Sequence, residues 1–456
     1  MSGEKNSIYW WETDPVVPGE PLRGRERADV CIVGGGYTGL WTARHLKLAD
    51  PSLEIAVVES SWAGSGASGH NDGYAMTVLD MSLHHLVEHH GPELAGAAHR
   101  AVARSVVEIG EFCEAHAPDA EYERNGFTGV AVNDAQRWRL QRDLEAAERI
   151  GVADDFELRE GDAAREAIGS PRVRAVLREG TGALLNPQRL ARRLARAVGE
   201  LGVGIWERSP ASSIEPGRVR TAQGEVEAER IVVATNAYQH ALPQFRSRVA
   251  PLWSYAMVSE PLTDAQLERV AWPGREGFED KRNFITIGRP MRENRILWGG
   301  RLAPYFYGND MSGRHMRHER VFAELREAWT DFFPAWSEVG FTHAYGGCIG
   351  ITPSFLPYVG TLEGGIHYGY GYNGHGVAPS HTVGRTLADL VLGRRTSHTE
   401  LVYVDQREGR FPPEPLRFLG TRLTTALLER QDRRMDAGGG AGEMDPLLLR
   451  IVNRLG

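Results

Sequence analysis

The stretch that decides the fold is residues 28–43, which read ADVCIVGGGYTGLWTA. Ala28–Val33 is a short apolar run rich in β-forming residues, so it predicts a buried strand. Gly34, Gly36 and Gly39 then give G-x-G-x-x-G, followed by residues that suit a helix. In this pattern the first glycine makes the tight turn, the second lets the backbone approach a pyrophosphate, and the third packs the helix on the strand. We therefore expect a dinucleotide whose phosphates lie at the helix N-terminus.

A second apolar run, Leu53–Val58, predicts another strand and ends at Glu59, 20 residues after Gly39. A carboxylate at this distance binds the hydroxyl pair of a ribose. The same carboxylate would repel a 2′-phosphate, which disfavours NADP. The motif alone does not distinguish NAD from FAD.

Composition excludes several classes of protein. The chain has 456 residues, 3 cysteines and a net charge of −8, so we expect neither a disulfide framework, nor a four-cysteine zinc site, nor a nucleic-acid binder. Its three lysines are Lys5, Lys47 and Lys281, which leaves few candidates for pyridoxal-phosphate chemistry. No apolar run is long enough to span a membrane and no signal peptide is evident, so a cytoplasmic protein without a transmembrane anchor is expected.

Four further segments resemble the D-amino-acid-oxidase-like superfamily of FAD oxidoreductases: SSWAGSGASGHNDGY at 60–74, TGALLNPQRL at 181–190, IVVATNAY at 231–238 and GYGYNGHGVAPS at 369–380. The resemblance covers about residues 28–400. Within the superfamily, SIYWWET at 7–13 and GASGHN at 66–71 look most like the gamma-glutamylputrescine oxidase group.

The resemblance implies a fold of class α/β and α+β, with a Rossmann-like FAD-binding domain and a discontinuous antiparallel-sheet substrate domain. The FAD-binding domain is expected at 1–80, 181–243 and 345–410, the substrate domain at 81–180 and 244–344, and a C-terminal helical tail at 411–456. In that tail, residues 446–455 form a short amphipathic stretch that we expect to dock on its own domain.

FAD is expected to be bound non-covalently. The residues expected to contact it are Gly34, Gly36, Gly39, Glu59, Ser60, Ser65, Ala67, Ser68, Asn71, Gly73, Ala211, Thr235, Gly374 and Gly376. Cys348 precedes Thr352-Pro353 and stands near the position where some sarcosine oxidases attach the flavin. A shift of one residue along a strand turns a side chain to the opposite face, so we expect Cys348 to point away from the flavin and to pack in the core.

The expected activity is oxidation of a C–N bond in a small amine or amino acid. A hydride passes to flavin N5, the imine hydrolyses, and oxygen or another electron acceptor reoxidises the flavin. The alternative is a flavin dehydrogenase that acts on a hydroxy acid or an N-methyl group and has a protein or quinone acceptor. A homo-oligomer is left open.

Candidate catalytic residues are His375, Tyr372 and Tyr255, and candidate substrate-binding residues are His70, Tyr74, Trp253, Arg289, Trp298 and Arg301. Aromatic walls suit an alkylamine, and an arginine can hold a substrate carboxylate with two hydrogen bonds. The histidines of SLHHLVEHHG at 82–91 include an i,i+4 pair, but a third ligand is not evident, so we expect no metal. No lysine occurs at 295–301, and Ile349 stands where relatives commonly carry arginine. These differences leave the substrate and the efficiency of oxygen use open.

Overall fold

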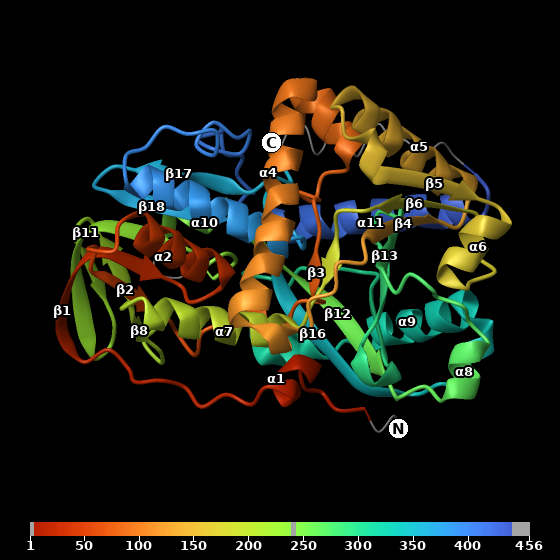
Figure 1. Cartoon of the computed structure of the whole chain (residues 1–456), viewed down its shortest axis with the longest axis horizontal. Helices are drawn as coiled ribbons and strands as arrows, with labels where there is room; N and C mark the ends of the chain where they lie inside the picture. The colour runs from red at the N-terminus through yellow and green to blue at the C-terminus, as the bar shows by residue number, and fades with distance from the viewer. Residues whose placement is uncertain (1–3, 239–242, 440–456) are drawn as a thin grey trace.

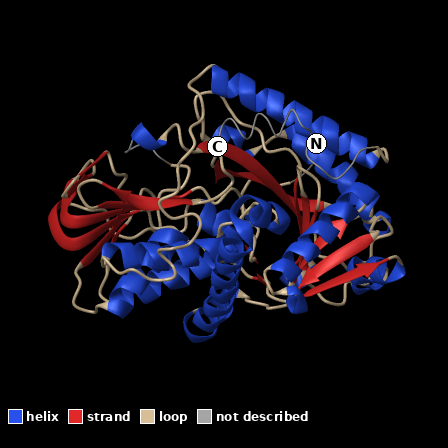
Figure 2. Ribbon diagram, turned by 90° about the horizontal axis from the view of Figure 1, so that it is seen from above, coloured by secondary structure: helices blue, strands red, loops and turns tan. Residues whose placement is uncertain are grey.

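The computed structural model describes residues 4–238 and 243–439. Its described strands form two eight-stranded sheets and one short pair. The sheet that contains the glycine-rich motif lies on the left of Figure 1 and the second sheet on the right. Figure 2 shows the same two sheets from above, with helices packed around them.

The first sheet is built around β1 (Gly24–Val33), whose last four residues are buried. β1 pairs in parallel with β2 and β11, and the sheet order is β17-β18-β11-β1-β2-β8, with β10 paired to β11 and β9 paired to β10. The other strands are β2 (Ile55–Val58), β8 (Gly204–Trp206), β9 (Ser213–Glu215), β10 (Arg218–Arg220), β11 (Gly224–Val233), β17 (Tyr358–Leu362) and β18 (Ile366–Tyr370). This arrangement is the predicted Rossmann-like α/β part of the fold.

Three helices cover one face of this sheet: α2 (Tyr37–Ala49), α7 (Pro187–Glu200) and α10 (Val377–Val391), and α4 (Leu83–His116) packs on α7 and α10. α2 and α10 lie side by side on it (Figure 1). α4 stands between the two halves of the molecule in that view. It is interrupted at Gly91, which has φ 80° and precedes Pro92.

The second sheet has the order β16-β12-β15-β14-β13-β4-β6-β5 and is antiparallel except for the β13–β4 pair. Its strands are β4 (Phe127–Ala131), β5 (Phe156–Glu160), β6 (Ala175–Glu179), β12 (Ala250–Ser259), β13 (Gly277–Asp280), β14 (Thr286–Pro290), β15 (Ile296–Gly300) and β16 (Phe341–Ile351). α9 (Glu319–Phe332) packs against it through an aromatic core that includes Trp298, Trp329 and Trp336.

The remaining helices and strands are α1 (Tyr9–Thr13), α3 (Ala67–His70), α5 (Asp134–Arg149), α6 (Asp162–Ile168), α8 (Asp264–Glu268), α11 (Leu416–Asp436), β3 (Tyr74–Ala75) and β7 (Ala183–Leu184). One-turn 3₁₀ helices occur at Pro118–Ala120, Ala153–Asp155, Pro243–Phe245, Arg292–Asn294, Gly313–Met316 and Pro334–Trp336.

One expected domain boundary, between residues 344 and 345, falls inside β16. The whole of β16 pairs with β12 of the second sheet, from Ala250–Ile351 to Ser259–Phe341. The boundary therefore belongs after β16, because a strand cannot be divided between two sheets while its ladder continues. The helical part of the tail is α11, and residues 446–455 lie outside the described residues.

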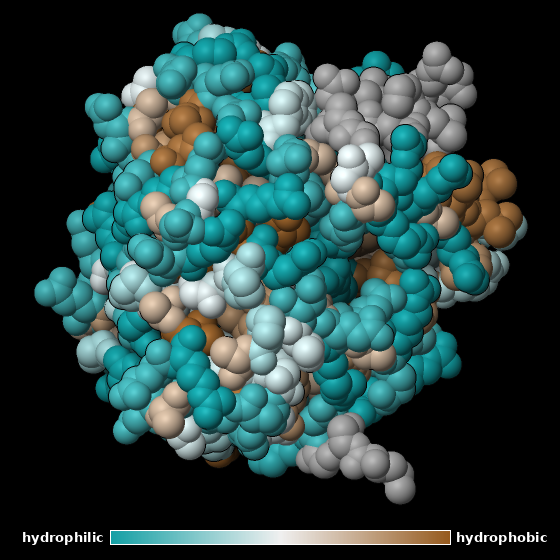
Figure 3. All heavy atoms as spheres, turned by 90° about the vertical axis from the view of Figure 1, so that its right-hand side faces the viewer, coloured by the Kyte–Doolittle hydropathy of each residue, from teal (hydrophilic) through white to brown (hydrophobic). Residues whose placement is uncertain are grey.

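The described face seen in Figure 3 is mostly hydrophilic, with small separated hydrophobic patches. None of the described helices is long and apolar enough to cross a membrane.

Candidate active site

A cavity of about 1510 Å³ lies between the two sheets and is lined by residues of both. Pockets for drug-sized ligands occupy about 300–1,000 Å³. The cavity is therefore large enough for a cofactor together with a substrate. α11 contributes Gly420, Thr421, Thr424 and Thr425 to its lining.

The glycines of the first motif are required by close backbone approaches. Gly34 has φ 111°, and a Cβ there would come within 2.5 Å of the carbonyl oxygen of Ala234. A Cβ at Gly39 would overlap the carbonyl oxygen of Gly34, so this glycine lets α2 approach β1. A Cβ at Gly36 would lie 2.9 Å from the Ser68 hydroxyl oxygen. That oxygen accepts a hydrogen bond from the backbone N–H of Tyr37, at the start of α2.

Glu59 closes the same end of the cavity. Its carboxylate accepts hydrogen bonds from the backbone N–H groups of Gly35 at 2.7 Å and Ser61 at 2.9 Å, and from the hydroxyls of Ser60 and Ser65. Four donors hold the side chain in one orientation at the cavity wall. The carboxylate that the sequence predicts at the ribose is therefore fixed by protein donors at the cavity wall.

Most of the predicted cofactor residues line the cavity. Those that line it are Gly34, Gly36, Glu59, Ser60, Ser65, Ala67, Ser68, Asn71, Ala211, Thr235, Gly374 and Gly376. Gly39 and Gly73 do not line the cavity. Gly39 lies at the contact between α2 and β1, and Gly73, with φ 75°, lies against Leu185 and Arg289. A dinucleotide needs donors for its phosphates and an acceptor for its ribose. The cavity offers the N-terminus of α2, glycines that leave room for the phosphates, and the carboxylate of Glu59. The residues present therefore fit FAD.

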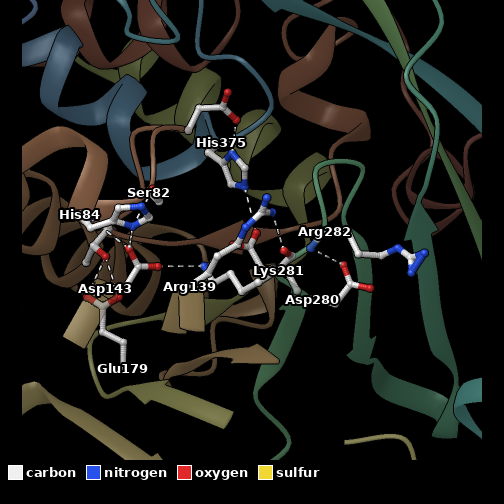
Figure 4. Close-up of polar contacts among 12 residues, drawn as sticks. Ser82, His84, Arg139, Asp143, Glu179, Asp280, Lys281, Arg282 and His375 are labelled. Carbon is white, nitrogen blue, oxygen red and sulfur yellow. Dashed lines mark hydrogen bonds and ion pairs between the residues drawn. The ribbon is translucent and has the colours of Figure 1, made fainter. Parts of the chain in front are cut away.

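His375 links the two sides of the cavity (Figure 4). It follows the turn after β18, and its Nδ1 lies 2.6 Å from Asp80 Oδ1 while its Nε2 lies 3.2 Å from Glu279 Oε2. Burial alone lowers the pKa of His375, but the hydrogen bonds to Asp80 and Glu279 outweigh burial and raise it to about 10. His375 is therefore a fixed cation, with both ring N–H groups engaged.

The charged network continues from Glu279 to Lys281, Asp143 and His84. Lys281 Nζ lies 3.1 Å from Glu279 and 3.6 Å from Asp143, and Asp143 lies 2.9 Å from His84 Nδ1. Burial raises the pKa of Glu279, but the charges of Lys281 and His375 bring it down to about 2. Glu279 therefore remains ionised inside the cavity.

The two predicted catalytic tyrosines line the cavity, but protein atoms engage their hydroxyls. The hydroxyl of Tyr372 lies 2.6 Å from Thr38 Oγ1, and that of Tyr255 donates to the carbonyl oxygen of His315 at 2.9 Å. Burial raises the pKa of both tyrosines. Their hydroxyls therefore stay protonated at neutral pH.

His70, Asp72 and Tyr74 belong to the glycine-rich segment at 60–74 and line the cavity. Both ring nitrogens of His70 are buried without a hydrogen-bond partner among the described residues, and burial lowers the pKa of its imidazole to about 4. Burial raises the pKa of Asp72 to about 7, against the opposing charge of Arg289. These two side chains have hydrogen-bonding capacity that a bound molecule would use.

The structure contradicts three of the predicted substrate contacts. Trp253, Trp298 and Arg289 do not line the cavity. The Trp298 indole N–H donates to the carbonyl oxygen of Leu325, and Trp253 packs in the same aromatic core. Arg289 is buried and donates from Nη1 to the backbone oxygens of Asp72, Gly73 and Leu185.

Arg301, by contrast, does line the cavity, and its buried Nε has no hydrogen-bond partner among the described residues. It has φ 64° and follows β15 directly. It is the predicted arginine that stays available to a ligand.

The histidine cluster at the start of α4 makes local contacts. His84 contacts Asp143, His85 lies 2.7 Å from the Ser82 hydroxyl, and His89 lies 2.8 Å from the carbonyl oxygen of His85. Within residues 4–238 and 243–439, no group of three or more His, Cys, Asp or Glu is arranged to hold a metal ion.

Several cavity residues were not identified from the sequence, namely Asp80, Asp143, Glu179, Glu279 and Lys281. None of them belongs to a motif. The one signal available was an acidic or basic residue inside or directly after an apolar strand, as with Glu279 and Lys281 around β13.

This fold and this site define a flavin-dependent oxidoreductase. The family model described as FAD dependent oxidoreductase (DAO) matches residues 29–390, and the chain belongs to this family. The predicted enzyme class and the FAD cofactor are thereby confirmed.

Among curated proteins, the chain is 31% identical to gamma-glutamylputrescine oxidoreductase of Escherichia coli K12, covering 86% of this chain and 90% of that protein. It is 30% identical to a probable oxidoreductase OrdL of Rhizobium meliloti, covering 92% and 94%. Among solved structures, glycine oxidase from Geobacillus kaustophilus matches with a TM-score of 0.70 and 20% identity, over 84% of this chain and 99% of that one. The last comparison supports the fold alone.

Proposed function

We propose that this enzyme oxidises a C–N bond in a small amine or amino acid, releasing an imine that hydrolyses, with oxygen as the electron acceptor. The observation that carries the proposal is the single cavity that joins the glycine-rich loops to charged side chains of the second sheet. The names of its relatives, which include gamma-glutamylputrescine oxidoreductase and glycine oxidase, support the same chemistry.

We assign cofactor binding to the first sheet and substrate binding to the second. The first sheet and α2 would hold FAD, with Gly34 and Gly36 at the pyrophosphate and Glu59 at the ribose. When bound, FAD supplies the acceptor for the two electrons removed from the substrate. The second sheet and α11 would hold the substrate and exclude water.

Arg301 is proposed to bind a substrate carboxylate. Its guanidinium lines the cavity, and its buried Nε lacks a partner among the described residues. A guanidinium binds a carboxylate with two parallel hydrogen bonds, which fixes orientation as well as charge. An amino acid would therefore be held by its carboxylate.

Asp72 is proposed to accept the proton of the substrate ammonium, because an amine must be neutral before its C–H bond can be oxidised. Asp72 lines the cavity, and burial raises its pKa to about 7. A general base works best when its pKa lies near the working pH. His375 is less suited to this role, because Asp80 and Glu279 already engage both of its ring N–H groups.

The test is anaerobic mixing of the yellow holoenzyme with amines, amino acids, N-methyl amino acids and hydroxy acids. Bleaching of the flavin by an amine or amino acid, followed by hydrogen peroxide formation on admission of air, is the expected result. Bleaching by hydroxy acids alone would overturn the proposal in favour of a hydroxy-acid dehydrogenase. Bleaching by an amine without peroxide would contradict oxygen as the acceptor and leave the C–N chemistry in place.

A further inference from the structure

Glu179 is a buried carboxylate in the cavity wall. Glu179 is the last residue of β6 and is 6% exposed to solvent. It lines the cavity together with Leu177 of the same strand. Residues two apart on a strand point to the same face, so both side chains face the cavity. In the view of Figure 4, Glu179 extends toward the group formed by Asp143 and His84.

Protein donors satisfy this carboxylate only in part. The hydroxyl of Thr77 lies 2.7 Å from Oε1 and 2.8 Å from Oε2 of Glu179, so one hydrogen is shared by two oxygens. His99 Nε2 is 3.7 Å from Oε1, and burial lowers the pKa of His99 to about 4, so His99 is neutral. A carboxylate has about four lone-pair sites, and most of them remain open here.

The cations nearby belong to other carboxylates. Lys281 is ion-paired with Glu279 and Asp143. His375 is hydrogen-bonded to Asp80 and Glu279. An ionised Glu179 would thus be a buried anion without a cation of its own among the described residues, which proteins avoid unless the charge is lost or a ligand supplies the counter-charge.

Two aromatic rings flank Glu179. Phe127 of β4 and Phe156 of β5 stand directly opposite Glu179 in the register of the second sheet, one on each side, and both line the cavity. Opposite residues on neighbouring strands share a face. Aromatic faces attract cations and also cover methylene groups. The Phe127 ring lies 6.2 Å from the ring of Tyr74, the last residue of the glycine-rich segment at 60–74. This wall of the cavity therefore leads toward the end that is predicted to bind the flavin.

We propose that Glu179 binds a second ammonium group of the substrate, remote from the C–N bond that is oxidised, with Phe127 and Phe156 covering the chain between the two nitrogens. The substrate class is therefore an alkyl diamine, or an amine that carries another cationic nitrogen several methylenes away. This inference rests on the proposed function, because it names the substrate class for the same cavity.

Proton linkage supports this assignment. Burial raises the pKa of Glu179 to about 8, which the Thr77 hydrogen bond opposes. The charged groups that face it from neighbouring elements are Asp143, Asp155 and Lys281, and His99 is neutral. The free side chain is therefore largely protonated at pH 7. An ammonium beside it would ionise it, so binding should release about one proton to the buffer.

The experiment is anaerobic calorimetric titration of the holoenzyme with putrescine and cadaverine, each paired with the monoamine in which a methyl group replaces one terminal ammonium. Titrations in two buffers of different ionisation enthalpy count the protons released. Glu179→Gln keeps the shape and the Thr77 contact but removes the charge. Glu157→Gln, at a 53% exposed side chain of β5, is the matched control.

We expect at least one diamine to bind ten-fold or more tightly than its monoamine, with the additional proton release. Glu179→Gln should abolish both differences while Glu157→Gln keeps them. Equal weakening of diamine and monoamine by Glu179→Gln, or no diamine preference in the wild type, would overturn the inference. Flavin bleaching in the same samples separates the two proposals. Glu179-dependent binding without bleaching by any amine would overturn amine oxidation alone, and bleaching without Glu179-dependent selectivity would overturn the inference alone.

Discussion

Nη1 of Arg289 lies 2.9 Å from the backbone oxygen of Asp72, so a buried guanidinium fixes the loop that carries a cavity carboxylate. The same nitrogen reaches the backbone oxygens of Gly73 and Leu185 at 3.0 and 2.9 Å. Arg289 therefore joins β14, the loop that contains Asp72 and Gly73, and the segment before α7. It is a structural residue of the site.

Arg289→Met should lower the free energy of unfolding by about 3 kcal/mol or more, because hydrogen bonds from a charged group contribute about 1.5–3 kcal/mol each and three backbone carbonyls lose the hydrogen bond from Arg289. Urea unfolding of the holoenzyme measures this. Arg301→Met is the matched comparison: it should unfold like the wild type but raise KM for a carboxylate-bearing substrate at least ten-fold. The opposite pattern in the two variants would show that the roles of the two arginines are reversed.

Gly36→Val should yield a folded protein without flavin. A Cβ at Gly36 already approaches the Ser68 oxygen to 2.9 Å, and a β-branched side chain would fill the space that a pyrophosphate needs. Flavin absorbance per polypeptide is the measurement. Gly199→Ala is the control, since a Cβ at that helical position meets nothing within 4 Å. Stoichiometric FAD in folded Gly36→Val would refute the pyrophosphate assignment.

The glycine-rich loops could be predicted from the sequence because their pattern is local. Gly34, Gly36 and Gly39 lie within six residues, and a Cβ at any of them would come closer than 3.0 Å to another atom. The charged side of the cavity could not be predicted, since His375 and Glu279 are 96 residues apart and Thr77 and Glu179 are 102 apart. The pairing of β13, β4 and β6 puts Glu279 and Glu179 in one sheet, and only the tertiary fold places His375 and Thr77 beside them.

The error over Trp298 and Arg289 has a different cause. Every residue of β14 and β15 is buried, so the alternation of polar and apolar residues that normally identifies the two faces of a strand is absent. An aromatic residue and an arginine on these strands therefore gave no sign of which face meets the cavity. Arg301, one residue beyond β15, does line the cavity.

The pH dependence of catalysis should report Asp72. The pKa of its carboxyl is about 7, raised by burial, so the ionised, proton-accepting form accumulates as the pH rises through 7. We expect the rate of anaerobic flavin bleaching at low amine concentration to rise over the same range. Asp72→Asn should remove this part of the profile and slow bleaching at least ten-fold, whereas Asp162→Asn, at an 86% exposed side chain, should not. An unchanged profile in Asp72→Asn would exclude Asp72 as the base.

His375 should make stability depend on pH in the alkaline range. Its folded-state pKa is about 10, above the ordinary value of 6.5, because hydrogen bonds to Asp80 and Glu279 outweigh burial. The stabilisation is therefore fully present below pH 6.5 and is lost as the pH rises through 10. Thermal unfolding of wild type and His375→Gln should differ most at pH 6 and converge toward pH 10. A constant difference across this range would contradict a protonated His375.

Cys348 should not hold the flavin covalently. Gly347 and Ile349 line the cavity, whereas Cys348 between them does not. It packs instead in the aromatic core opposite Trp253, its register partner on β12, as expected for successive residues of a strand. Burial raises the pKa of its thiol to about 12, so the reactive thiolate is absent at neutral pH. Cys31 and Cys113 do not line the cavity either.

Acid precipitation should therefore leave FAD in the supernatant, for the wild type and for Cys348→Ser alike. A yellow pellet from the wild type that becomes colourless in Cys348→Ser would show that the thiol reaches the flavin.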